Sequence, residues 1–280
     1  MPELPEVETI CQALKPVLEG CSFQKIQLNR PNLRYPFPVN FENKLAHYPI
    51  NLVRRRAKYL LVDFSHGLTL VWHLGMSGRV IIESIDKPSS KLSPHDHVIF
   101  RTSHNHKITY RDPRRFGFLR LSPTSQLAET SPFNTLGPEA LNDPQLNAHV
   151  FYDRLRCHNV SLKSVLLDQK IIAGVGNIYA SEALWQARLS PLRLTKTLTF
   201  VEAERLLKEL QNVLRRAIAA GGSTLRDHIL PNGEIGYFQH EFKVYNRENV
   251  LCTYCQSTPL CKIIQNGRAT YYCKTCQQVD

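Results

Sequence analysis

Short hydrophobic runs dominate the first half of the chain. From residue 22 to residue 122, alternating or wholly apolar segments recur between turns rich in Gly, Ser, Asn and His. The segments are FQKIQL, YLLVDF, LTLVWHL, RVIIE, HVIF, KITYR and FGFLRL. Runs of this length and spacing are typical of β-strands. The pattern therefore predicts a mainly antiparallel β-sandwich or barrel.

A helical period appears on either side of this region. Before it, a helix is predicted over residues 6–18, with Pro5 in its first turn and one apolar face made of Val7, Ile10, Leu14 and Val17. After it, the clearest helix covers residues 200–220. Thr199 and Glu202 form a capping-box pattern, and Gly221-Gly222 ends the helix. Its predicted face is Leu206, Leu207, Leu210, Val213, Leu214 and Ile218.

Between the strands and the later helices, residues 123–150 are rich in Pro, Ser and Asn and have no clear period. Such composition is typical of a hinge. The fold class is thus α+β. We divide the chain into a β-domain (1–125), a hinge (126–150), a helical domain (151–240) and a cysteine-containing segment (241–280), and we expect a polar loop over 222–238.

Composition narrows the function classes. Thirty-five Lys and Arg face 24 Asp and Glu, giving a net charge of +11 and a pI near 9.3. This excess favours a polyanionic partner, above all nucleic acid, although a basic surface that only aids solubility has the same composition. The acidic N-terminus does not resemble a signal peptide, and no stretch reaches the ~20 apolar residues of a membrane span. We expect an intracellular protein with reduced cysteines.

The four clustered cysteines predict a metal site. Cys252 and Cys255 form one CxxC pair, Cys273 and Cys276 form another, and seventeen residues separate the pairs. This spacing is typical of a structural zinc site, because two such turns supply four thiolates at tetrahedral corners. A redox dithiol is the alternative.

A β-hairpin is predicted between the two cysteine pairs. Asn266-Gly267 separates CKII from RATYYC, and Asn-Gly favours a type I′ turn. Arg268 follows the turn, where a guanidinium suits a phosphate, although a solvated surface arginine would look the same. Cys261 lies outside both pairs and is not counted as a ligand.

The first residues carry a candidate nucleophile. Removal of Met1 would give Pro2 a free secondary amine, whose pKa of ~8 leaves roughly a tenth unprotonated at neutral pH. Such an amine attacks a sugar carbon to give an iminium. Glu3 is a candidate proton donor, and Glu6 is a second acid nearby. Alternatively, both acids only stabilise the helix N-terminus.

Five ordered motifs and the cysteine hairpin together resemble formamidopyrimidine-DNA glycosylase across nearly the whole chain. The motifs are PELPEVET at 2–9, RRAKYLL at 55–61, HLGMSG at 73–78, DPRRFG at 112–117 and GVGNIYASE at 174–182, and the hairpin that contains the cysteine pairs follows them. The resemblance implies a β-sandwich domain, a helix-two-turn-helix domain (151–240) and a zinc finger (241–280). It also implies excision of 8-oxoguanine and formamidopyrimidines from duplex DNA, followed by β,δ-elimination at the abasic site.

Catalytic roles carry over by motif. Pro2 corresponds to the Schiff-base nucleophile and Glu3 to the acid, with Glu6 as an additional catalytic candidate. Lys58 corresponds to the lysine that assists β-elimination. Arg268 corresponds to the finger arginine that is credited with δ-elimination and a phosphate contact.

DNA contacts carry over in the same way. Met76, Arg114 and Phe116 match the residues that fill the hole left by an extruded base. Arg114 presents donors, which suit the acceptor edge of cytosine better than adenine, by roughly 1–3 kcal/mol. Further matched contacts are His73, His95, Lys163 and Asn177. His158 stands where the family often has a lysine-rich run, so this sequence departs from the pattern there.

The sequence is also compatible with two other functions. An endonuclease VIII-like glycosylase would act on oxidised pyrimidines, but ELPEV and HLGMSG argue against it. A zinc-ribbon protein without catalysis would only bind damaged DNA, and its function would survive a blocked N-terminus. We expect a monomer in the bacterial cytoplasm, associated with the nucleoid, with lesion-containing or abasic duplex DNA as its partner and no membrane association.

Overall fold

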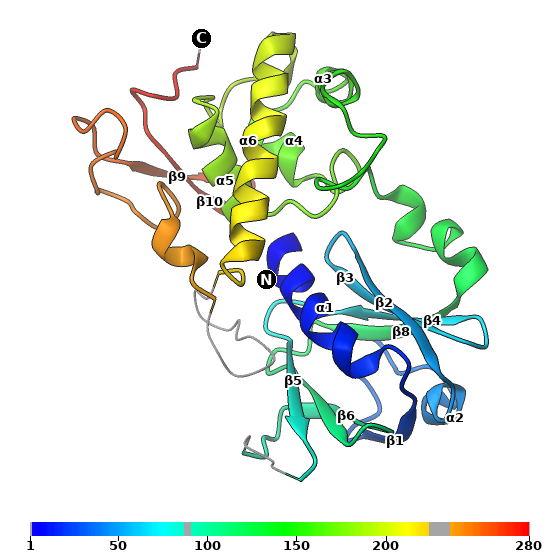
Figure 1. The fold of residues 1–280 in the computed structure, drawn as a ribbon. Helices are drawn as coiled ribbons and strands as arrows, with labels where there is room; N and C mark the ends of the chain where they lie inside the picture. Colours follow the sequence, from blue (N-terminus) through cyan, green and yellow to red (C-terminus); the bar gives the residue numbers. More distant parts are fainter. Residues whose placement is uncertain (1, 87–90, 224–235, 280) are drawn as a thin grey trace. The chain divides into compact units, whose positions relative to one another are not determined.

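The computed structural model describes residues 2–86, 91–223 and 236–279 and divides the chain into two compact units (Figure 1). The first, here called the β unit, comprises Met1–Asn134 and Ala220–Tyr237. The second, the helical unit, comprises Thr135–Ala219 and Phe238–Asp280.

The β unit contains two four-stranded sheets in its described part, and every pairing within them is antiparallel. One sheet has the order β1 (Phe23–Leu28), β6 (Asp96–Thr102), β7 (His106–Arg111), β5 (Arg79–Ser84). The other has the order β2 (Ile50–Arg56), β3 (Tyr59–Phe64), β4 (Leu68–His73), β8 (Phe118–Pro123). The predicted antiparallel fold class is confirmed.

Strand β2 was not among the predicted runs. Its sequence INLVRRR ends in three arginines, and only Ile50 and Val53 are fully buried. The register also shifts between Ile50 and Leu52, which breaks the two-residue period on which strand prediction depends. The short helix α2 (Phe41–Leu45) was likewise not predicted.

Helix α1 (Leu4–Leu18) begins two residues before its predicted start, because Glu3 is its N-cap and forms a capping box with Glu6. Val7, Ile10 and Leu14 are fully buried, in the same core as residues of both sheets. The helix packs on β2 and β3 (Figure 1). Its N-terminus is therefore fixed to the sheet that contains β2.

The segment predicted as a hinge contains short 3-10 helices, η1 (Thr124–Glu129) and η2 (Phe133–Thr135), and the boundary between the two units falls after Asn134. The helical unit contains α3 (Ala148–Arg156), α4 (Leu162–Leu167), α5 (Asn177–Gln186), η3 (Thr195–Thr197), α6 (Phe200–Ala219) and η4 (Phe238–Glu241).

Helix α6 confirms the predicted cap. The Thr199 N–H donates to Glu202 Oε2 at 2.9 Å, and the Glu202 N–H donates to Thr199 Oγ1 at 3.4 Å. The predicted face is buried except for Ile218, which is half-buried. Gly221 and Gly222 follow the helix with φ of 75° and 79°, a conformation that glycine adopts without strain.

The predicted hairpin is also confirmed. Strands β9 (Cys261–Gln265) and β10 (Arg268–Tyr272) pair around Asn266 and Gly267, whose φ values of 50° and 72° are both positive, as a type I′ turn requires. In the described part of the chain, no helix combines the length and apolarity needed to cross a membrane.

Candidate functional site

The start of α1 holds three of the predicted catalytic residues. Glu3 and Glu6 are 4% and 2% exposed, and Pro2 directly precedes them. Glu6 Oε2 accepts the Glu3 N–H at 2.8 Å, while Oε1 accepts the N–H and the hydroxyl of Ser223 at 2.8 and 2.9 Å. Glu6 therefore joins the N-terminus to residue 223. Most of the loop predicted over 222–238 lies outside the described residues.

Lys58 lies in the turn between β2 and β3, next to Ala57, which has a φ of 52°. Arg55 holds this turn against α1: its Nε lies 2.7 Å from Glu8 Oε2, and its Nη1 donates to the Ala57 carbonyl at 2.9 Å. The Arg55 side chain is only 9% exposed, so water screens this ion pair weakly. One helix thus fixes Pro2, Glu3 and the turn that contains Lys58.

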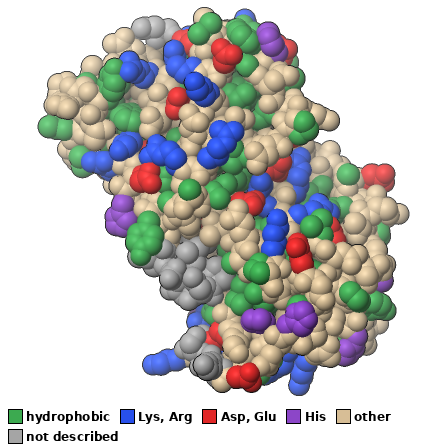
Figure 2. Space-filling view, viewed as in Figure 1, with side chains coloured by type: hydrophobic (Ala, Val, Ile, Leu, Met, Phe, Trp, Pro, Cys, Tyr) green, Lys and Arg blue, Asp and Glu red, His purple; other side chains and the backbone are tan. Residues whose placement is uncertain are grey.

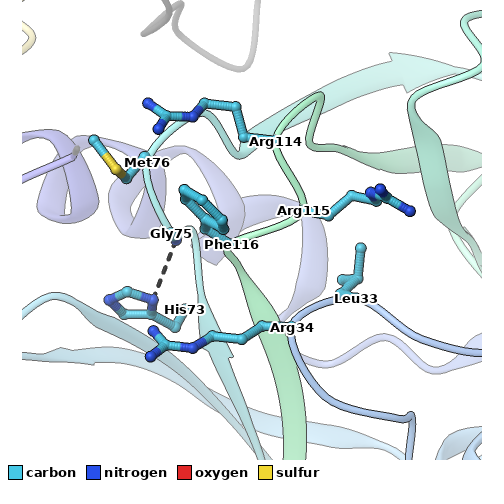
Figure 3. Close-up of a pocket in the computed structure, with 8 residues that line it drawn as sticks. All are labelled: Leu33, Arg34, His73, Gly75, Met76, Arg114, Arg115 and Phe116. Carbon is cyan, nitrogen blue, oxygen red and sulfur yellow. Dashed lines mark hydrogen bonds between the residues drawn. The ribbon is translucent and has the colours of Figure 1, made fainter.

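A pocket of about 720 Å³ in the β unit brings four predicted DNA contacts together (Figure 3). It is lined by Leu33, Arg34, His73, Gly75, Met76, Arg114, Arg115 and Phe116. Met76 and Phe116 are 39% and 44% exposed, so both apolar side chains reach solvent at the pocket. The Arg114 guanidinium lies 4.9 Å from the centre of the Phe116 ring.

Four residues of this lining, Gly75 and three others, were not predicted as site residues. Leu33 and Arg34 come from the loop after β1, and Arg115 follows Arg114. The Arg34 N–H donates to the Gly117 carbonyl at 3.2 Å, which attaches that loop to the pocket. The only signal in the sequence was a cation within an apolar segment, LRYP, and that pattern is common on ordinary surfaces.

His73 has a defined tautomer. Its Nδ1 accepts the Gly75 N–H at 3.1 Å, so the ring proton is on Nε2 (Figure 3). Burial, together with the positive charges of Lys58 and Arg34, lowers the pKa of His73 to about 4. At neutral pH the side chain is therefore a neutral N–H donor.

This low pKa predicts a pH effect on stability. In the unfolded chain His73 binds a proton below about pH 6.5, whereas the folded protein resists protonation until about pH 4. Stability is therefore lost as the pH falls through this window. We therefore expect the melting temperature of His73→Gln to rise relative to that of wild type as the pH is lowered from 7 to 4.5. His95→Gln, at an exposed side chain, is the control. A difference in melting temperature between His73→Gln and wild type that does not change with pH would contradict the low pKa of His73.

His95 lies outside the pocket lining, at the base of the loop that contains Arg114. Its carbonyl accepts the Asp112 N–H at 3.0 Å, and its ring centre lies 6.5 Å from that of His97. The side chain is exposed. A DNA contact for His95 stays a prediction.

In the helical unit, Lys163 and Asn177 both contact the hairpin that contains Arg268. The Lys163 ammonium donates to the Ala269 carbonyl at 2.8 Å and to Thr270 Oγ1 at 2.6 Å. The Asn177 amide donates to the same carbonyl at 2.9 Å. Lys163 is only 1% exposed. Both side chains, expected to contact DNA, thus hold the residue next to exposed Arg268; the DNA contacts themselves stay predictions.

Glu182 is a structural residue of this site that the motif analysis did not single out. Its carboxylate is 2% exposed and accepts the backbone N–H groups of Lys243, Val244 and Tyr245 at 2.8–3.0 Å. Burial raises the pKa of Glu182, and the three N–H donors oppose this shift. The segment leading into the cysteine hairpin is thereby attached to α5. A charged residue within the apolar run ASEALW was the available signal.

His158 lies between α3 and α4 with a half-buried side chain. Its carbonyl accepts the Thr195 hydroxyl at 2.5 Å. The described contacts do not join its side chain to Lys163, Asn177 or Arg268, and its predicted DNA contact stays a prediction.

The four predicted cysteine ligands form one cluster. All four Sγ atoms lie within 4.8 Å of one another, and the pairs Cys252–Cys276 and Cys255–Cys273 are each 3.8 Å apart. A tetrahedral zinc ion with bonds of about 2.3 Å to sulfur requires sulfur atoms about 3.8 Å apart. The cluster therefore fits one structural zinc ion. Cys261 is not in the cluster, as predicted.

Comparison with known proteins agrees with this geometry. Residues 1–119 match the model of the formamidopyrimidine-DNA glycosylase N-terminal domain, and residues 136–228 match that of the formamidopyrimidine-DNA glycosylase H2TH domain. The chain is 44% identical to proteins named formamidopyrimidine-DNA glycosylase from Azorhizobium caulinodans and Agrobacterium fabrum, over 99% of its own length and 100% of theirs.

Solved structures extend the likeness to three dimensions. The MutM (Fpg) protein of Thermus thermophilus is 36% identical with a TM-score of 0.87, and all of both chains is covered. A mutant Lactococcus lactis enzyme in complex with DNA containing Fapy-dG is 31% identical with a TM-score of 0.88, over 99% of this chain and 100% of that one. Sequence, fold and cysteine cluster agree, and the chain belongs to the formamidopyrimidine-DNA glycosylase family.

Proposed function

We propose that this protein removes oxidised purines, 8-oxoguanine and formamidopyrimidines, from duplex DNA and then cleaves the abasic site by β,δ-elimination. The observation that carries the proposal is the N-terminus: Pro2 directly precedes two buried carboxylates whose hydrogen bonds fix it to the start of α1. A basic chain of net charge +11 suits a DNA partner, and Lys and Arg side chains are spread over the viewed face (Figure 2).

Recognition begins with extrusion of the damaged base, which costs a few kcal/mol of lost stacking. Met76 and Phe116 are the exposed apolar side chains that would occupy the vacated position. Arg114, beside Phe116, offers donors to the acceptor edge of the orphaned cytosine. The Nε2–H of His73 and the guanidinium of Arg34 provide donors for backbone phosphates.

Chemistry then proceeds at Pro2. Its unprotonated amine attacks the sugar C1′, the damaged base departs, and the sugar ring opens to an iminium as Glu3 supplies a proton to the ring oxygen. The iminium accepts electrons, so loss of a proton from C2′ breaks the C3′–O bond. Loss of a proton from C4′ of the resulting conjugated iminium then breaks the C5′–O bond. Lys58 assists the first elimination and Arg268 the second. Glu6 positions Glu3 through the hydrogen bond to its N–H.

Zinc takes no part in these reaction steps. When bound by Cys252, Cys255, Cys273 and Cys276, it stabilises a segment too small to fold alone. Arg268, in the hairpin between the pairs, then has a fixed position from which to contact a phosphate. We assign the residues 1–125, 151–240 and 241–280 to catalytic, DNA-binding and zinc-finger domains. Action on a bacterial chromosome places the protein in the cytoplasm, at the nucleoid.

Borohydride trapping tests the proposal. The protein is mixed with duplex DNA containing one 8-oxoguanine opposite cytosine, borohydride is added, and the crosslinked peptide is identified by mass spectrometry. Borohydride reduces the iminium to a stable amine, so we expect a crosslink on Pro2 in protein that lacks Met1. Tight binding without a crosslink would instead favour a non-catalytic DNA-binding protein. A crosslink only with an oxidised-pyrimidine duplex would favour an endonuclease VIII-like enzyme.

A further inference from the structure

Two loops that contain the exposed apolar and basic side chains of the pocket are in direct backbone contact. We call them the wedge loops: residues 74–78, which include Met76, and residues 112–117, which include Arg114 and Phe116 (Figure 3). A Cβ atom on Gly75 would lie 2.3 Å from the Gly117 nitrogen, and one on Gly117 would lie 1.7 Å from the Tyr110 hydroxyl. At Gly75 the two backbones therefore meet with no side chain between them, and the Tyr110 hydroxyl lies against Gly117 and Gly78.

A buried hydrogen-bonded pair joins the two loops behind this contact. Ser77 and Asp112 are 3% and 0% exposed. The Ser77 hydroxyl donates to Asp112 Oδ1 at 2.6 Å and accepts the Arg114 N–H at 3.1 Å. Asp112 Oδ2 accepts the Gly117 N–H at 2.9 Å. The two bonds from N–H groups therefore fix the backbone at Arg114 and directly after Phe116.

The direction of these bonds is determined by their chemistry. A carboxylate only accepts, so the single Ser77 proton must point at Asp112, which leaves the hydroxyl lone pairs for the Arg114 N–H. The Asp112 side chain is buried, and hydrogen bonds to a carboxylate are stronger than those between neutral groups. The His97 ring, 2.8 Å from the Asp112 carbonyl, holds the other side of the same residue.

We propose that Ser77 and Asp112 are positioning residues that hold the Arg114 backbone in place against the base opposite the lesion, and that they thereby set the preference for cytosine over adenine. This inference rests on the proposed function. Neither side chain needs to contact DNA. Without the Ser77 hydroxyl, the Arg114 N–H and one Asp112 oxygen each lose a partner, and the guanidinium samples positions that suit no particular base.

The measurement is binding to duplexes that contain a tetrahydrofuran abasic analogue opposite either cytosine or adenine. The ratio of interest is the dissociation constant for the adenine duplex divided by that for the cytosine duplex. For Ser77→Ala we expect this ratio to fall by about fivefold, the equivalent of one net hydrogen bond. Thr69→Val is the matched control. Thr69 is fully buried in the same unit, and its hydroxyl donates to the Asp63 carboxylate at 2.7 Å. We expect this control to keep the wild-type ratio.

A purely structural role predicts a different result. If Ser77→Ala weakens binding to both duplexes equally, or changes the ratio no more than Thr69→Val does, the inference is overturned. Should Ser77→Ala fail to fold, Ser77→Cys provides a weaker donor and acceptor of similar shape. Its ratio is expected below that of wild type, and an unchanged ratio would overturn the inference.

The proposed function is tested separately by trapping. A wild-type ratio near one would overturn the role of Ser77 and Asp112 in base preference, yet a borohydride crosslink on Pro2 would leave the glycosylase and lyase activity standing. Conversely, an absent crosslink together with the expected Ser77→Ala effect would retain the positioning role and refute the chemistry.

Discussion

Protein that retains a residue before Pro2 is expected to lose lyase activity by roughly a thousandfold or more, the scale on which removing a nucleophile acts. A Gln inserted between Met1 and Pro2 is one way to retain Met1. The Pro2 nitrogen then lies within a tertiary amide, whose lone pair is delocalised, and it forms no iminium. The measurement is strand cleavage of an abasic duplex, with the N-terminus verified by mass spectrometry.

Binding should survive this change, because Met76, Arg114, Phe116 and Arg268 are unaltered. We expect affinity for a tetrahydrofuran duplex to stay within about threefold, less than the effect of one typical hydrogen bond. Pro2→Gly in protein without Met1 is the matched control: it keeps an α-amino group and should still form a borohydride crosslink. Normal cleavage by the extended protein would refute Pro2 as the nucleophile and require another amine.

The elements could be predicted wherever one face of a segment is buried throughout. Val7, Ile10 and Leu14 repeat at helical spacing because α1 buries a single face, and the capping pair Thr199 and Glu202 identifies the start of α6. Strand β2 was not predicted because its arginines form ion pairs with Asp63 and Glu8, and local periodicity does not indicate such contacts.

The side-chain network of the site could not be predicted for a related reason. Ser77 and Asp112 are thirty-five positions apart, and a serine in a glycine-rich turn does not indicate which residue it contacts. Lys163 looks like a surface cation in LKSVLL, but its partner Ala269 is 106 positions away. The motif resemblance named Lys163 only as a DNA contact, which stays a prediction, whereas the contacts of all three residues depend on long-range packing.

Loss of one zinc ligand is expected to remove DNA binding through the hairpin while the β unit stays folded. Structural zinc contributes about 10–16 kcal/mol to the folding of small zinc-finger peptides, which far exceeds what the few buried residues of this segment supply. Cys255→Ser removes one of four ligands from a half-buried position, so it leaves little cavity of its own. We expect zinc content to fall from one per chain towards zero and DNA affinity to fall by roughly a hundredfold.

Cys261→Ser is the matched control, because Cys261 is also half-buried and lies in the same segment but outside the cluster. It should keep both zinc and affinity. The salt dependence adds a second measurement: without an ordered Arg268, one phosphate contact is lost and the slope of log affinity against log salt should shrink by about one. Equal zinc loss in both variants would contradict the four-cysteine site. An unchanged slope in Cys255→Ser would instead show that Arg268 makes no phosphate contact, even though Lys163 and Asn177 hold the neighbouring residue.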